Sequence, residues 1–265
     1  MTIPFPERRA DAPGGAAFLA SLADMKLSAR QEAMAAALLA GDVPARLRRF
    51  VEVTLTRRGH TAALRVAPDF LLIGSDEDFV TAPLRALVAQ RVADALGCVV
   101  PTRPLVDAVL AAGAKAPLVG MWRKDAPDGW LESWRCHRDH QARIQRPAAP
   151  AGALVAGYLK DVVLTPSLQK KVARNRRWPV AIYGAWDASK GKVVQGLVRD
   201  HAIDYVDLQP RDAPRVGRHD ARRRRALGRR RARRPRPRRS ALRRRRHRPR
   251  ALRAREVAAR RAVAA

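Results

Sequence analysis

The sequence predicts a single α+β domain, because helical spacing dominates its first half and strand-like alternation dominates its second half. The regular succession of strands and helices that is typical of a doubly wound parallel sheet does not occur. We expect helices mainly in the first half and antiparallel strands in the second. The predicted domain covers residues 17–207, after a disordered lead-in (residues 1–16) rich in proline, glycine and charge. A disordered arginine-rich tail, residues 208–265, follows it.

The first predicted helix begins at Ser28, which has capping-box spacing with Gln31, and ends at Gly41. Its apolar face consists of Met34, Leu38 and Leu39. A short helical segment at residues 45–49 leads into the first strand.

Two further helices are predicted over residues 84–96 and 102–113. Each ends at a glycine, and Thr102 is placed to cap the second. The apolar stripe of that helix consists of Leu105, Val106, Val109 and Leu110.

Alternating apolar residues predict a hairpin, with strands over residues 51–55 and 62–66 joined at residues 57–60. The other strand-like segments are residues 70–73, 160–165, 179–183, 193–198 and 201–207. An acidic loop, residues 74–78, follows the first of these. Residues 114–150 are the least regular part and contain three tryptophans among charges and prolines.

The formal charge of +30 is distributed very unevenly along the 265 residues. The tail at residues 208–265 holds 25 Arg, no Lys and three acidic residues, so it carries +22 and leaves +8 for residues 1–207. No apolar run reaches the roughly 18 residues of a membrane span, and the N-terminus lacks the apolar stretch of a signal peptide. Two cysteines exclude a disulfide framework. As written, the chain is expected to be cytoplasmic.

Five segments carry a resemblance to known proteins. They read LLAGDVPARLRRFVEVTL (38–55), LRVAPDFLLIGSDEDF (64–79), AQRVADALGCVVPTRPLVDAV (89–109), ALVAGYLKDVVLTPSL (153–168) and VAIYG (180–184). Through them, residues 17–207 resemble a group of uncharacterised bacterial proteins. The resemblance implies an exported or envelope setting for the group, although this N-terminus shows no signal.

The resemblance also bears on the tail. In that group, the counterpart of Tyr205-Val-Asp207 is followed by Tyr-Ser-His-Gly, whereas this chain continues as LQPRDAPRVG. One set of codons that can encode those ten residues is CTA CAG CCA CGG GAT GCG CCT CGT GTC GGG. Without their first base they read YSHGMRLVS. A GC-rich gene read in a shifted frame contains many CGN codons, which accounts for a tail with many arginines and no lysine. Phosphate binding alone does not account for this, because it accepts either cation. We therefore hypothesise a frame-shifted translation from about Leu208.

The candidate catalytic residues are His201, Asp204 and Asp207. A histidine can act as a general base, and a neighbouring carboxylate can orient it. With the restored Tyr-Ser-His-Gly turn, this composition is that of a hydrolytic site. The alternatives are a solvated histidine at the start of a strand and a structural histidine in the restored turn.

The candidate binding residues are Lys160, Asp161, Tyr183 and Tyr205. Lys160 and Asp161 open a strand and could orient a site or bind an anion, or form an ordinary edge-strand charge pair. The two tyrosines could donate hydrogen bonds to a substrate, although aromatic residues on strands more often pack in the core.

No metal site and no cofactor are predicted. Cys136, His137 and His140 form the most metal-like cluster, but a fourth ligand at suitable spacing is missing, and a polar helix charged all round is the alternative. The loop at residues 74–78 resembles a calcium loop only in its acidity. No glycine-rich phosphate loop occurs.

Two functional classes remain. The first is a His-dependent hydrolase or ligand-binding domain for a small molecule or cell-envelope component, inactive in this truncated form. The alternative is a nucleic-acid-binding protein that acts through its basic C-terminal arm, residues 208–265. Non-specific binding of nucleic acid by this tail would not by itself establish that function, because phosphate attraction needs no evolved site.

We expect the gene to read YSHG, followed by an ordinary C-terminal sequence, when one base is removed near the codon of Leu208. Resequencing codons 195–225 checks this. Codons that cannot give YSHG would contradict the frame-shift hypothesis and would make salt-dependent nucleic-acid binding the leading function.

Overall fold

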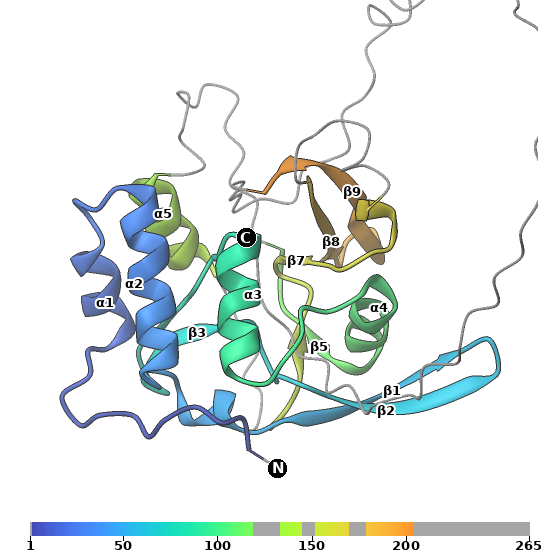
Figure 1. Ribbon diagram of the computed structural model, residues 1–265, viewed down its shortest axis with the longest axis horizontal. Coiled ribbons are helices and arrows are strands. Elements are labelled where there is room, and N and C mark those ends of the chain that lie inside the picture. Colours follow the sequence, from blue (N-terminus) through green and yellow to red (C-terminus); the bar gives the residue numbers. More distant parts are fainter. Residues whose placement is uncertain (1, 119–132, 145–151, 170–178, 204–265) are drawn as a thin grey trace, which may run out of the picture. The chain divides into compact units, whose positions relative to one another are not determined.

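The computed structural model describes residues 2–118, 133–144, 152–169 and 179–203, and all of them belong to one unit of the chain (Figure 1). Helices and mainly antiparallel strands make up this part, which confirms the α+β class. The predicted segregation is only partial, because two hairpins lie among the first helices and one short strand pair is parallel. Among the described residues, no helix is long and apolar enough to cross a bilayer.

The hairpin of β3 (Leu72–Gly74) and β4 (Phe79–Thr81) ends in an acidic turn that caps the first helix, α1 (Gly15–Ser21). The Asp78 carbonyl accepts from Gly15 N at 2.8 Å, and Asp78 Oδ1 accepts from Ala16 N at 2.9 Å. These bonds satisfy amides that have no partner within the helix. The contact needs a glycine, since a Cβ on Gly15 would lie 2.4 Å from Phe79 Cα.

Asp76 of the same turn caps a second element, the 3-10 helix η1 (Ala45–Arg48). Its carboxylate accepts from Ala45 N at 3.2 Å and from Arg46 N at 3.1 Å. Two of the three acidic residues in this loop, Asp76 and Asp78, therefore have a role in helix capping.

The chain before α1 is ordered in residues 2–14, which differs from the disordered lead-in predicted for residues 1–16. Ile3 and Phe5 are buried in the first hydrophobic core. Ile3 N donates to Arg48 O at 2.7 Å, and the Arg48 guanidinium donates to Pro6 O at 2.7 Å. Local composition does not reveal this order, because the partner residue, Arg48, lies more than 40 residues further along the chain.

Helices α2 (Leu27–Leu39) and α3 (Ala86–Ala95) pack together, and Gln31 joins them. The predicted capping box is wrong: Ser28 lies inside α2, whose N-cap residue is Lys26 and makes no side-chain cap hydrogen bond. Gln31 Oε1 instead accepts from Arg85 N at 2.7 Å, and its Nε2 donates to Pro83 O at 2.8 Å, so it caps α3. The predicted closure at Gly41 is confirmed by its φ of 81°.

The predicted hairpin of β1 (Val51–Arg57) and β2 (His60–Val66) is confirmed, with Val51 paired to Val66 and Arg57 to His60 (Figure 1). Arg58 and Gly59 have φ values of 51° and 78°, as a tight two-residue hairpin turn requires. Only the end of the hairpin nearest Val53 and Val66 is buried.

The strands β7 (Lys160–Val162), β8 (Pro179–Asp187) and β9 (Lys192–Ala202) form an antiparallel sheet in that order. Helix α4 (Arg103–Ala112) packs against both β8 and β1. A second hydrophobic core lies around α4 and contains its predicted apolar stripe of Leu105, Val106, Val109 and Leu110. A parallel pair, β5 (Ala114–Lys115) and β6 (Val155–Ala156), adjoins it.

Helix α5 (Trp134–Arg143) binds the end of β4 through Thr81. Gln141 Oε1 accepts from Thr81 N at 2.8 Å, and His137 Nε2 lies 3.1 Å from Thr81 O. The helix is therefore not charged all round. Cys136, His137 and His140 are all buried. Residues three and four apart on a helix share one face, and this face of α5 is turned into the fold.

Burial of His137 makes stability depend on pH. Desolvation lowers the pKa of His137 from 6.5 to about 4. The unfolded state therefore binds a proton more readily than the folded state between these two values, and stability falls as the pH decreases through this window. We expect a loss of about 3 kcal/mol between pH 6.5 and pH 4 from this group.

Urea unfolding of the wild type and of His137→Gln at several pH values measures this dependence. The variant is expected to show a smaller loss of stability across the window, whatever its stability at neutral pH. Equal losses in the two proteins would show that His137 does not titrate in this way.

Candidate functional site

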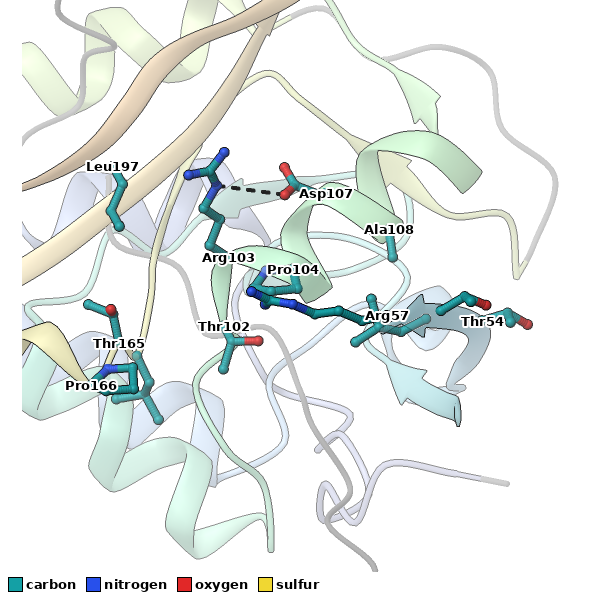
Figure 2. Close-up of a pocket in the computed structure, with 13 residues that line it drawn as sticks. Thr54, Arg57, Thr102, Arg103, Pro104, Asp107, Ala108, Thr165, Pro166 and Leu197 are labelled. Carbon is teal, nitrogen blue, oxygen red and sulfur yellow. Dashed lines mark ion pairs between the residues drawn. The ribbon is translucent and has the colours of Figure 1, made fainter. Parts of the chain in front are cut away.

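An open groove of about 860 Å³ lies beside the start of α4 (Figure 2). Its walls come from the end of β1, the first turns of α4, the segment after β7 and one residue of β9. This volume lies within the roughly 300–1,000 Å³ that is usual for small-molecule sites. The lining residues with polar or charged side chains are Thr54, Thr56, Arg57, Thr102, Arg103, Asp107 and Thr165.

The start of α4 is held in place by the chain that follows β7. Leu164 N donates to Pro101 O at 2.8 Å, and Thr102 pairs with Leu164 as an isolated parallel bridge. Thr102 occupies the predicted N-cap position with extended backbone angles, but its side chain makes no cap hydrogen bond and lines the groove.

Arg103 is held at the groove by two neighbours. Its Nε lies 3.7 Å from Asp107 Oδ2, one turn further along α4, and its guanidinium carbon lies 4.9 Å from the centroid of the Tyr183 ring. Figure 2 shows the ion pair with Asp107. The Arg103 side chain is nevertheless 53% exposed, so it stays accessible from solvent. A guanidinium held in this way presents donors that suit a carboxylate or phosphate.

Tyr183 supports this pair from β8. Its hydroxyl donates to Asp107 Oδ1 at 2.5 Å. Burial raises the pKa of Tyr183, and the hydrogen bond to Asp107 raises it further, against a smaller opposite effect of Arg103. The phenol is therefore protonated at neutral pH and acts as a donor that fixes the carboxylate.

Arg57 supplies the second cation of the groove. It is the last residue of β1, and its side chain points toward the start of α4 in Figure 2. Two arginines and one aspartate give the lining a net positive charge. The hydroxyl groups around them can donate hydrogen bonds to an anion.

Lys160 and Asp161 are buried on β7, each about 1% exposed. Asp161 pairs with Tyr183 and Lys160 with Gly184, so both residues lie on the strand next to the one that carries the site tyrosine. Neither lines the groove. β7 is the edge of its sheet, yet these are not the solvated charges of an ordinary edge strand, because other parts of the fold cover them.

His201 lies near the end of β9 rather than at the start of a separate strand. It pairs with Val180, which belongs to the first core, and Ile203 packs against that same core. Tyr183 belongs to the second core and Leu197 packs against it, on the other face of the sheet. Irregularities in the β8–β9 pairing shift the alternation between Leu197 and His201. His201 is therefore separated from the groove by the sheet.

The other residues of the predicted catalytic and binding sets, Asp204, Tyr205 and Asp207, lie outside the described residues. The predicted catalytic set stays a prediction.

The cluster of Cys136, His137 and His140 lies inside the fold, where His137 is engaged with Thr81. Within the described ranges, no group of three His, Cys, Asp or Glu residues is arranged to hold a metal ion.

Of the residues at this site, Tyr183 was predicted from the sequence, whereas Arg57, Arg103 and Asp107 were not. One signal for the last two was present, since a basic and an acidic residue four apart at the start of a predicted helix form a local ion pair. Nothing in the sequence indicates that the hairpin brings Arg57 to the same place.

Comparison of the chain with protein-family models, curated proteins and solved structures found no match. The resemblance to uncharacterised bacterial proteins stays a prediction from the sequence.

Proposed function

We propose that this domain binds a small molecule that carries a carboxylate or phosphate group, and that the groove beside α4 is its site. The observation that carries the proposal is Arg103, which is ion-paired with Asp107 and lies over the Tyr183 ring while half of its side chain stays exposed. An arginine fixed before binding loses less conformational freedom when an anion arrives.

Arg57 and the threonine hydroxyls of the groove supply further donors around the anion. The groove is not a purely cationic surface, because it also contains the carboxylate of Asp107. This carboxylate repels an anion and so restricts where the anion can bind. The domain is therefore proposed to recognise one anionic group in a defined orientation.

Binding of inorganic phosphate tests this proposal. We expect phosphate, exchanged for chloride at constant ionic strength, to raise the melting temperature of the full chain by a few degrees at about ten times its dissociation constant. Anion binding to the Arg-rich tail is common to the wild type and its point variants, so it cancels when their melting temperatures are compared.

Arg103→Gln and Arg57→Gln are expected to lose most of this stabilisation. Arg91→Gln is the matched control, since Arg91 is also about half exposed (51%) and ion-paired, but to Glu32 on α2 outside the groove. Retention of the full phosphate effect in Arg103→Gln would contradict the proposal.

The sequence also predicted a hydrolase that uses His201, Asp204 and Asp207, as the alternative to a ligand-binding domain. It depends on a histidine outside the groove and on a restored reading frame, so activity assays on the repaired protein are its test.

A second function, nucleic-acid binding, is favoured by the 25 arginines of residues 208–265. We expect the full chain to bind a DNA duplex with an affinity that falls steeply as salt increases, because bound arginines release counterions. Deleting residues 208–265 is expected to abolish this binding, whereas Arg103→Gln leaves it unchanged. Electrophoretic mobility shifts at several salt concentrations measure it, and binding that survives the deletion would contradict this role of the tail.

A further inference from the structure

We propose that the ligand of the groove is an anionic amphiphile, with a carboxylate or phosphate head at Arg103 and Arg57 and an aliphatic tail along the apolar part of the same groove. This inference rests on the proposed anion site and adds the chemical class of the rest of the ligand.

The groove has an apolar part as well as a cationic part. Its apolar lining residues are Leu55, Pro104, Ala108, Leu164, Pro166 and Leu197. Five of them come from the three elements that also supply the polar lining residues, and Leu197 comes from β9, so one molecule in the groove contacts both kinds of surface.

Leu164 is the central observation. Among the described residues, only three large hydrophobic side chains are exposed, and Leu164, which is 44% exposed, is the one in the groove. Its backbone is fixed by the bridge to Thr102, so its side chain is held beside the start of α4. An aliphatic group that covers Leu164 removes apolar surface from water, which favours binding.

The lining also indicates what kind of apolar group fits. None of the described residues that line the groove is aromatic. Sites for nucleobases commonly use aromatic side chains as stacking platforms. Leucine, proline and alanine side chains instead suit a flexible aliphatic chain, and the two arginines complement the charge of its head.

A series of linear alkyl phosphates from ethyl to octyl, used below their micellar concentrations, tests the inference on the full chain. The readout is the ligand-induced rise in melting temperature, from which a dissociation constant is derived. We expect affinity to increase by up to roughly fourfold per added methylene while the chain still finds apolar surface. Inorganic phosphate is the reference for the head alone.

Leu164→Ser removes the exposed apolar contact and keeps the backbone bridge. This variant is expected to bind octyl phosphate about tenfold more weakly than the wild type, with no change for inorganic phosphate. Leu87→Ser is the matched control, because Leu87 is 64% exposed on α3 and does not line the groove. The melting temperature of each variant without ligand verifies that it folds.

The possible outcomes separate the two proposals. A chain-length dependence that is weakened in Leu164→Ser and kept in Leu87→Ser supports an amphiphilic ligand. Stabilisation by phosphate with no chain-length dependence, or an equal dependence in Leu164→Ser, overturns the amphiphile and leaves the anion site. Absence of stabilisation by every phosphate in the series overturns both.

Discussion

The acidic turn between β3 and β4 is the contact on which the arrangement of the described residues depends. Asp78 caps α1 from 62 residues further along the chain, and Asp76 caps η1. The approach of α1 to this turn is so close that only glycine fits at Gly15. Because η1 leads directly into β1, the same turn also helps to position the hairpin that ends at Arg57. Through η1, this turn therefore helps to position β1, which forms one wall of the groove.

Helix α4 connects this framework to the proposed chemistry. Its apolar stripe lies in the second core, against β1 and β8, and fixes the rotation of the helix about its axis. A second constraint acts at the start of the helix, where the bridge between Thr102 and Leu164 fixes the backbone. Arg103 and Asp107 are therefore presented to the groove by a rigid element, and Tyr183 of β8 completes their support through a hydrogen bond across the interface between helix and sheet.

The elements with strong local patterns were predicted well. The hairpin followed from alternating apolar residues around a turn that needs positive φ angles, and α4 followed from its apolar stripe. Predictions failed where a distant partner decides the outcome. Gln31 caps α3 and not its own helix, and Ile3 and Phe5 enter a core whose other members lie much later in the sequence. For the site, Tyr183 was predicted, whereas its meeting with Arg103 and Asp107 was not.

The sequence by itself determined the fold class, most of the helices and strands, and the uneven distribution of charge between residues 1–207 and residues 208–265. These properties depend on spacing and composition, which are local and can be counted along the chain. Only the tertiary structure decided which polar residues act together. The irregular pairing of β8 and β9 directs His201 to one face of the sheet, while Tyr183 and the groove belong to the other. One extra residue in a strand reverses which face a side chain meets, and long-range packing, not local propensity, selects where that residue is accommodated.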